Sequence, residues 1–330
     1  MKKENISKKI LNWYDNNKRK LPWRNHLSKK QLQYFTLVSE FMLQQTQVKT
    51  VIPYFENFIK KISNLEKLAN VSDSKLMKCW EGLGYYSRAK NLKKTAIKIV
   101  SEFGGSLPST IDELKSLPGV GDYTSRAIMA IAFNKQIIPL DGNVERLIKR
   151  IFYLRKNREL SKKNIIEKKN FFGKSSRSSD YAQAIMEIGA LICKPLNPLC
   201  FECPISKNCK SYKKNNFEIK SKNKFNKIKY FEAKIYQNKN KYLLIKNNKF
   251  KFLKNLLIFP MKEVKKNKFN TSISKKINIK MSNMNMRIVL NEKNKLIKIR
   301  NSYLLDKKNI KDQILPSFTK KIFNSVSNYS

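Results

Sequence analysis

The sequence predicts a mainly α-helical domain over residues 1–210 and a smaller mixed α/β domain over residues 228–330. Three observations support this division. Apolar residues in the first part recur at helical spacing, four cysteines close that part, and a pattern typical of short strands follows a stretch rich in Lys and Asn. The length of 330 residues also favours two domains, because single hydrophobic cores usually stop growing near roughly 250–300 residues.

The helices of the first domain are defined by apolar spacing and by turns that contain Gly and Pro. The N-terminal segment has apolar residues around Trp13, but it contains Glu4 and Asp15 and no continuous apolar run. It therefore predicts an amphipathic helix and not a signal peptide. Further helices are predicted at Gln31–Lys49, Ser74–Trp80, Ser87–Phe103, Ile111–Ser116, Tyr123–Phe133, Val144–Tyr153 and Asp180–Ile192.

The pattern of the chain changes after the cysteines. Residues 211–227 are rich in Lys and Asn with little periodicity, which predicts a linker. Two strands are expected on either side of the polar turn Asn238–Asn240, and a third where alternate apolar residues share one face. These predicted strands are Tyr230–Tyr236, Tyr242–Lys246 and Met286–Leu290.

Composition constrains the partners and the location. The chain has 70 Lys and Arg against 24 Asp and Glu, a net charge of +46 that favours a polyanionic partner. Because Lys is frequent even in the loops, this charge permits nucleic-acid binding without establishing it. No uncharged apolar run approaches the roughly 18–20 residues of a membrane span, so we expect a cytoplasmic protein with no membrane partner. His26 is the single histidine, and carboxylates must therefore carry any acid–base chemistry.

The four clustered cysteines have the spacing of a metal centre. They follow Cys-x6-Cys-x2-Cys-x5-Cys, and interspersed prolines favour turns in this segment. A four-cysteine zinc site usually presents two separated Cys-x2-Cys pairs, so the spacing better suits an iron-sulfur cluster. Cys79 stands outside the pattern and is expected to be a small buried hydrophobic residue. The ligand candidates are Cys193, Cys200, Cys203 and Cys209.

Two glycine-containing loops are candidates for contact with DNA. Gly119 and Gly121, between two helical patterns, allow a tight hairpin whose backbone amides can hold a phosphate, although a plain helical turn would also fit. Gly82 and Gly84 bracket an apolar residue and precede an aromatic one, and such a narrow loop can wedge into a base stack. The alternative for this second loop is burial against Trp80.

Two carboxylates are candidates for acid–base chemistry. Glu40 is the only charged residue in Gln31–Gln47, and an acid on an apolar helix face should have a raised pKa that suits proton donation. The alternative is a surface glutamate on the polar stripe of the helix. Asp141 precedes a predicted helix, where it could act as a helix N-cap, as a catalytic carboxylate, or as both.

Several of these segments resemble adenine DNA glycosylases of the MutY type, which form a helix-hairpin-helix base-excision family. The resemblance is close over residues 8–210 and weak over residues 228–330. It is carried by the cysteine spacing, by the hairpin Leu117–Gly121, and by the segments Leu21–Arg24 (LPWR), Ser39–Val48 (SEFMLQQTQV) and Trp80–Leu92 (WEGLGYYSRAKNL).

The resemblance implies a fold, a cofactor and a substrate. The fold would be a two-part helical glycosylase domain with an iron-sulfur loop, followed by a diverged MutT (Nudix)-like domain for lesion recognition. The four cysteines would hold one four-iron, four-sulfur cluster. The enzyme would be a monomer that acts on duplex DNA containing adenine opposite 8-oxoguanine. Residues 261–280 contain only Glu263 as an acid, so no Nudix pyrophosphatase activity is expected.

The resemblance also implies catalytic roles. Glu40 would protonate adenine and Asp141 would stabilise the sugar cation, while Tyr123 and Asn143 position these groups. Bifunctional endonuclease III relatives have a Schiff-base lysine where Tyr123 stands, and a phenol cannot form that imine. A monofunctional glycosylase is therefore implied. Glu187 matches a further acidic position of the family.

Further residues are implied to bind the substrate. Trp23 and Arg24 would line the adenine pocket, and Thr46 would lie near the oxidised guanine. Ser282 is the only match to a Phe-Ser-His motif of the second domain. The residues implied to enter the base stack are Gln45, Leu83 and Tyr85, and those implied to bind the DNA backbone are Gly119 and Gly121.

Two other functions fit parts of the sequence. An endonuclease III-like glycosylase-lyase for oxidised pyrimidines would need the lysine that Tyr123 replaces. A non-catalytic iron-sulfur protein that binds DNA or transfers electrons would need neither Glu40 nor Asp141.

Overall fold

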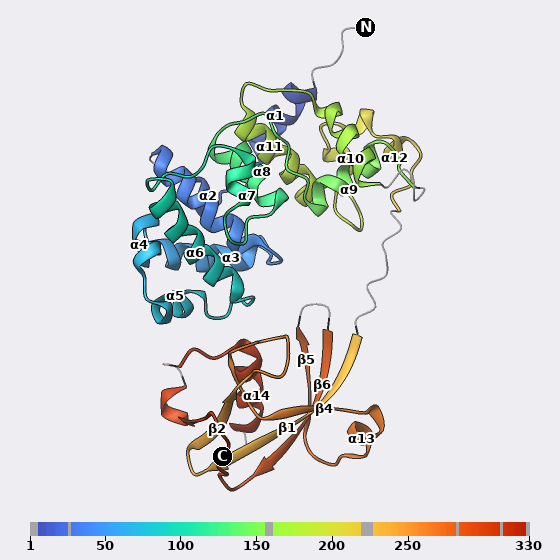
Figure 1. The fold of residues 1–330 in the computed structure, drawn as a ribbon. Coiled ribbons are helices and arrows are strands. Elements are labelled where there is room, and N and C mark those ends of the chain that lie inside the picture. The colour runs from blue at the N-terminus through green and yellow to red at the C-terminus, as the bar shows by residue number, and fades with distance from the viewer. Residues whose placement is uncertain are drawn as a thin grey trace. The chain divides into compact units, whose positions relative to one another are not determined.

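A computed structural model describes residues 6–25, 28–155, 161–218, 227–281, 284–310 and 313–327 (Figure 1). The chain divides into two compact units. A helical unit combines Met1–Val71 with Ser87–Ser221, and a sheet unit combines Ser72–Tyr86 with Lys222–Ser330. Within the described ranges, no helix is both long and apolar enough to cross a membrane.

One half of the helical unit is built around α2, which packs on α3, α6 and α8. The prediction of a single helix over Gln31–Lys49 is wrong, because α2 ends at Leu43 and Gln45 adopts a left-handed backbone conformation with φ of 57°. The helices of this half are α2 (Lys29–Leu43), α3 (Val48–Lys61), α4 (Leu65–Asn70), α6 (Ser87–Glu102), α7 (Ile111–Lys115) and α8 (Asp122–Ala132), of which α3 and α4 were not predicted.

The other half of the helical unit has its own apolar core. Its central helix, α9 (Gly142–Ile151), buries Val144, Leu147, Ile148 and Ile151, which recur at the spacing of one helical face. Around it lie α1 (Ile6–Asn17), α10 (Lys162–Lys168) and α11 (Ser178–Glu187), followed by a π-helical turn at Ile188–Ile192. The predicted linker begins inside the helix α12 (Lys210–Lys213), and its residues 219–226 lie outside the described ranges.

The C-terminal part of the sheet unit is a seven-stranded sheet with a main strand order of β3-β2-β1-β6-β5. β1 runs parallel to β6, and every other pairing is antiparallel. The three predicted strands are confirmed with shifted ends, and Met286, Ile288 and Leu290 are buried on one face as expected. The strands are β1 (Lys227–Asn238), β2 (Lys241–Lys246), β3 (Leu257–Ile258), β4 (Met261–Val264), β5 (Lys276–Met281), β6 (Met284–Lys293) and β7 (Ser302–Asp306).

Two helices pack on this sheet. α14 (Ser317–Ser327) covers one apolar face with Phe318, Ile322 and Phe323, and α13 (Lys266–Thr271) packs on β1. Neither helix was predicted, and neither were β3, β4, β5 and β7. β3 and β4 are only two and four residues long, and Lys and Asn dilute the apolar pattern of α13 and β5. In α14, by contrast, Phe318, Ile322 and Val326 recur at helical spacing, and this signal was missed.

The segment Ser72–Tyr86 consists of α5 (Asp73–Trp80) and a tight loop. Gly82, Gly84 and Tyr85 all have positive φ, and the Trp80 indole donates to the Gly84 carbonyl at 3.1 Å. The Glu81 carboxylate accepts hydrogen bonds from the Leu315 amide at 3.1 Å and from the Lys320 ammonium at 2.8 Å. These contacts explain why α5 groups with the sheet.

Candidate active site

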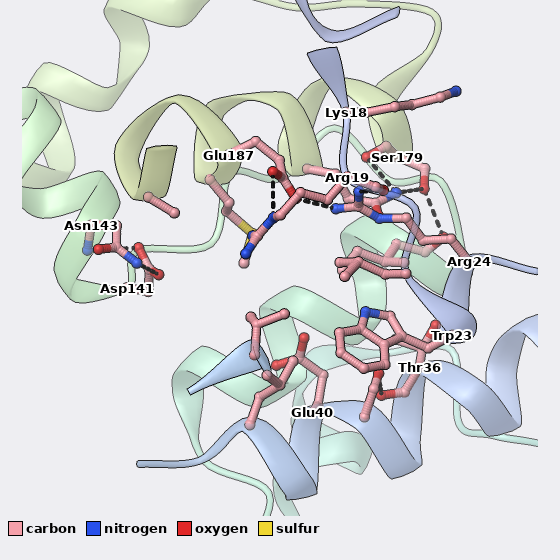
Figure 2. Close-up of a pocket in the computed structure, with 18 of the residues that line it drawn as sticks. Lys18, Arg19, Trp23, Arg24, Thr36, Glu40, Asp141, Asn143, Ser179 and Glu187 are labelled. Carbon is pink, nitrogen blue, oxygen red and sulfur yellow. Dashed lines mark hydrogen bonds and ion pairs between the residues drawn. The ribbon is translucent and has the colours of Figure 1, made fainter. Parts of the chain in front are cut away.

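A cavity of about 660 Å³ lies within the helical unit, between α2 and α11. Figure 2 shows Glu40 on α2 at one side and Glu187 on α11 at the other, with Asp141 and Asn143 at one end. The structure thus brings together nine residues singled out from the sequence: Trp23, Arg24, Glu40, Gln45, Thr46, Tyr123, Asp141, Asn143 and Glu187.

Glu40 is a buried acid with an unusual pKa. Glu40 is only 5% exposed, and it lies in the stretch Tyr34–Met42 of α2, in which every residue is buried. Burial and, to a smaller extent, the nearby Asp141 charge raise the pKa of the Glu40 carboxyl, and a hydrogen bond from the Tyr123 phenol lowers it, so that the pKa is about 7. The alternative of a surface glutamate is therefore wrong. Glu40 can donate a proton near neutral pH and take one back.

Tyr123, in the first turn of α8, is the hydrogen-bond partner of this acid. Burial, followed by the negative charges of Glu40 and Asp141, raises the pKa of Tyr123 well above its ordinary value. The phenol consequently stays protonated at any working pH and serves as a fixed donor to the Glu40 carboxylate.

Asp141 is the N-cap of α9, as the simpler interpretation of the sequence expected. Its Oδ1 accepts from the Asn143 amide at 2.9 Å and from the Val144 amide at 2.7 Å. The other oxygen, Oδ2, accepts from the Asn143 side chain at 2.9 Å. Because Asp141 also lines the cavity, the cap fixes a carboxylate beside Glu40, and the two interpretations are compatible.

Asn143 is held from three sides. Its side-chain oxygen accepts from Arg146 at 2.9 Å, and a Cβ at Gly189 would stand 3.0 Å from its backbone, so the close packing there favours glycine. Arg146 also donates to the carbonyls of Gly189 and Cys193, each at 2.7 Å. This arginine joins the Asp141 loop to the start of the cysteine segment. The sequence did not single it out.

The opposite wall carries a buried ion-pair network. Glu187 is 1% exposed and accepts from Arg19 and Arg24, each at 2.8 Å. Arg24 also donates to Gln183 at 2.7 Å. A buried carboxylate needs such pairing, since an unpaired charge would be strongly destabilising. Arg19 and Gln183 were missed, because Arg19 stands in a run of basic residues that looks like solvated surface.

Trp23 lines the same cavity from the side of α2 (Figure 2). Its residue is 9% exposed, and its ring packs edge-on against Phe55 with centroids 5.4 Å apart. The ring both belongs to the apolar core and lines the cavity. A flat aromatic surface and a paired guanidinium therefore face one space, an arrangement suited to a planar heterocycle with polar edges.

The predicted hairpin Leu117–Gly121 connects α7 with α8. Gly119 has φ of 82°, and a Cβ there would stand 2.9 Å from Asn91 Cβ and 3.0 Å from the Phe41 ring. Only glycine fits this position without displacement of its neighbours. Gly121 has an extended backbone and is the N-cap of α8, so its amide and the next ones open the helix.

Two other predicted DNA contacts, Leu83 and Tyr85, belong to the sheet unit. In the sheet unit, Leu83 is buried at 5% exposure and Tyr85 is 42% exposed. Ser282 lies outside the described residues. The roles of these three residues stay predictions.

The four clustered cysteines line one small cavity together with Arg150, Tyr212 and Phe217. Burial and the neighbouring thiols raise the pKa of Cys203 to about 12. Among the described residues, no three Cys, His, Asp or Glu side chains are grouped to hold a metal ion. Four thiols around one cavity are a donor set that suits an iron-sulfur cluster or a zinc ion. Cys79 is buried elsewhere at 2% exposure, as expected.

Arg150 fastens this cysteine segment. It is 3% exposed, and its guanidinium donates to the Lys194 carbonyl at 2.5 Å, to the Pro195 carbonyl at 2.8 Å and to the Cys193 sulfur at 3.4 Å. A buried cation beside the thiols favours their deprotonated form, which is the form that ligates metal.

Comparison with known proteins gives consistent matches. The family model of the HhH-GPD superfamily base excision DNA repair protein matches residues 38–170. An adenine DNA glycosylase of Buchnera aphidicola subsp. Baizongia pistaciae (strain Bp) is 39% identical over 284 residues, which cover 82% of this chain and 79% of that protein. One of Mus musculus is 41% identical over 213 residues, which cover 62% of this chain and 41% of the mouse protein. A solved structure of a thermostable thymine-DNA glycosylase is 29% identical in sequence and matches with a TM-score of 0.56. The match covers 63% of this chain and 95% of the glycosylase chain.

Proposed function

Because this chain belongs to the adenine DNA glycosylases, helix-hairpin-helix enzymes of base excision repair, we propose that its substrate is adenine paired with 8-oxoguanine or guanine in duplex DNA. The enzyme hydrolyses N-glycosyl bonds of DNA.

The observation that carries the proposed chemistry is the pair of carboxylates at one cavity. Glu40 is a buried acid whose pKa is about 7, and the charge of Asp141 contributes to that shift. Two acids whose environments differ in this way suit separate roles as proton donor and as anion. The bond to be broken is inaccessible inside a duplex, so the adenine must first leave the base stack and enter the cavity.

In the proposed reaction, protonated Glu40 donates a proton to N7 of the flipped adenine. The bond between N9 and the sugar carbon then breaks, its electron pair stays with the base, and neutral adenine leaves. Asp141 stabilises the resulting oxocarbenium-like sugar or bonds to it briefly, as in retaining glycosidases. Glu40, now ionised, takes a proton from water as that water adds to the sugar carbon. The product is an abasic site.

Other residues of the cavity would position the substrate. Tyr123 holds the Glu40 carboxyl by its hydrogen bond, and Asn143 holds Asp141. Trp23 offers an aromatic face to the flipped base, while Arg24 and Glu187 offer polar groups to its edge. Since Tyr123 cannot form an imine, the enzyme would be monofunctional.

The DNA would be held by backbone amides and by residues that enter the stack. The left-handed hairpin at Gly119 supports a phosphate contact through the amides that open α8, including that of Gly121. Gln45 and Thr46 line the cavity, which supports a role beside the flipped base and near the oxidised guanine. Leu83 and Tyr85 would enter the stack from the tight loop after α5. The sheet unit, with Ser282, would be a diverged MutT-like reader of 8-oxoguanine, and the enzyme would act as a monomer.

The cysteine cavity would hold one four-iron, four-sulfur cluster on Cys193, Cys200, Cys203 and Cys209. When bound, the cluster would supply a structural cross-link and no electron transfer, because hydrolysis of the glycosidic bond is not a redox reaction. Through Arg146, the segment it orders is tied to the loop of Asp141 and Asn143.

Single-turnover excision tests this function. Duplexes with one A·8-oxoguanine, A·G or A·T pair are incubated with excess enzyme, and alkali-dependent strand breaks are counted. We expect rapid release from the first duplex, slower release from the second and none from the third. Borohydride should trap no covalent adduct. An enzyme that binds DNA and carries its metal but releases no adenine would contradict the proposal, and a borohydride adduct would favour the endonuclease III-like alternative.

The pH dependence follows from the raised pKa of Glu40. The acid must be protonated at the start of the reaction, and its pKa is about 7. The single-turnover rate should therefore be level below neutrality and fall about tenfold per pH unit above that pKa. Rates are measured between pH 5 and pH 9 at constant ionic strength, with duplex binding measured in parallel. A level profile up to pH 9 would exclude Glu40 as the proton donor.

Replacement of a proposed cluster ligand should remove the metal. We expect Cys203→Ser to lower the iron content from about four atoms per chain to less than half of that and to lower the unfolding temperature, because metal binding is coupled to folding. Cys79→Ala is the matched control, since Cys79 lies outside the cysteine cavity, and it should keep its iron. Iron, zinc and acid-labile sulfide are quantified per chain. One zinc and no sulfide in the wild type would overturn the cluster assignment.

A further inference from the structure

The C-terminus of α2 is completed by an arginine from another helix. The last four carbonyls of a helix have no partner within it. At α2, Nη1 of Arg88 lies 3.1 Å from the Phe41 oxygen, 2.7 Å from that of Met42 and 2.6 Å from that of Gln44. The remaining carbonyl, of Leu43, accepts from the Thr46 amide at 3.1 Å. Arg88 is the second residue of α6, and its Nη1, which has two hydrogens to share, lies within hydrogen-bond distance of three of the four carbonyls.

Burial makes this cap hard to replace. Arg88 is 6% exposed, so water has little access to these carbonyls if the guanidinium is removed. The cation also lies at the negative end of the α2 dipole, where positive charge is stabilising. The result is one rigid junction between α2 and α6.

The junction lies next to a strained residue. Gln45 has φ of 57°, a conformation that residues other than glycine adopt rarely and only when their surroundings impose it. The carbonyl before it, of Gln44, is bound by Arg88. The Gln44 side chain donates to the Gly119 carbonyl at 3.3 Å and reaches Thr124 at 3.5 Å. The turn is therefore fixed both to α6 and to the hairpin.

We propose that Arg88 is a positioning residue that holds the turn Gln44–Thr46 and thereby directs Gln45 into the base stack. This inference rests on the proposed function, in which Gln45 enters the base stack and acts beside the flipped adenine. Arg88 acts through the backbone of α2 and not on the proton transfer. Glu40 lies one turn earlier on the same helix, so the test must separate an effect on base flipping from an effect on the acid.

A double-mutant cycle makes this separation. Arg88→Met keeps the apolar stem and removes the donors, and Gln45→Ala removes the side chain that enters the stack. We expect Arg88→Met to slow single-turnover excision by about 10–100-fold. In the Gln45→Ala background the same substitution should slow excision by less than about threefold, because the effects of two substitutions on one coupled interaction do not add. The fall of the rate above neutral pH should keep its midpoint. Lys94→Met removes an exposed cation from the same helix and should behave like the wild type.

Base flipping is also measured without excision. The target adenine is replaced by 2-aminopurine, whose fluorescence rises on unstacking, and the same cycle is run in a Glu40→Gln background. Arg88→Met should lose most of the fluorescence rise while duplex binding persists. If it does not fold, Arg88→Lys takes its place, with a smaller loss expected. If the wild type excises no adenine but the fluorescence of the four variants still shows coupling between Arg88 and Gln45, the proposed function is refuted and the positioning role of Arg88 is supported.

Three results would overturn the role of Arg88. One is an undiminished effect in the Gln45→Ala background, which would mean that Arg88 acts elsewhere. Another is a shifted pH midpoint, which would place the effect on Glu40. The third is a wild-type fluorescence rise in both Arg88 variants.

Discussion

Glu40→Gln is expected to abolish adenine release while duplex binding persists. The amide keeps the size of the side chain and can still accept from Tyr123, but it has no proton to donate near neutral pH. A general acid contributes about 10²–10⁴-fold to a rate, and here the same group also serves as the base for water. We therefore expect a loss at or above the upper end of that range in single-turnover excision from an A·8-oxoguanine duplex.

The free energy of unfolding of wild type and Glu40→Gln, measured as a function of pH, tests separately whether Glu40 is buried. Burial moves the Glu40 pKa from 4.5 to about 7, so the ionised form is disfavoured in the folded protein and stability falls as pH rises between these values. A shift of this size corresponds to about 3 kcal/mol. Glutamine cannot ionise, so the difference in unfolding free energy between wild type and variant should change by roughly that amount from pH 4.5 to pH 9. An unchanged difference would mean that Glu40 is solvated, and a variant with wild-type excision would exclude it as the acid.

The sequence predicted a candidate site residue where residues close to it in the chain determine its environment. Glu40 could be singled out because no other charge shares its helical stretch, and the burial of α2 bears this out. Asp141 could be singled out as an N-cap because it precedes a predicted helix, and as a proposed catalytic carboxylate because of the family resemblance. In both cases a local pattern determines the local environment.

The rest depends on contacts between residues far apart in the chain. Arg19 binds Glu187 from 168 residues away, and nothing near Arg19 distinguishes it from the other basic residues of its run. Likewise, α2 ends at Leu43 because Arg88 and the left-handed Gln45 complete it, although the apolar pattern continues to Lys49. Such tertiary contacts override helix propensity, and no local signal reveals them.

The sheet unit was hardest to predict for a physical reason. Several of its strands are short, and Lys and Asn dilute the apolar alternation of this part of the chain. The parallel pairing of β1 with β6 joins segments separated by 57 positions, as Lys227 opposite Met284 shows. Such pairing depends on the packing of the core beneath it, which includes α14, and the apolar periodicity within each element does not reveal which elements pair.

Asp141→Asn should separate the two roles that Asp141 combines. Asn is as good an N-cap as Asp, so the bonds to the amides of Asn143 and Val144 can persist and stability should change little. The negative charge beside the sugar is lost, however. Electrostatic groups of this kind contribute about 10²–10³-fold or more, so we expect single-turnover excision to fall by at least that factor.

The pH dependence of the residual excision rate of Asp141→Asn gives a second, independent test. The Asp141 charge raises the pKa of Glu40, so its removal should lower that pKa and shift the fall in rate to lower pH. Asp141→Ala is the matched variant, because it should lose the same charge effects and in addition about 0.5–2 kcal/mol of helix capping. Rates across pH and unfolding free energies are measured for both variants. If the two lose equal stability, Asp141 does not act as a cap through its side chain. If Asp141→Asn keeps its rate and its pH midpoint, the carboxylate has no part in the reaction and the paired-acid chemistry fails.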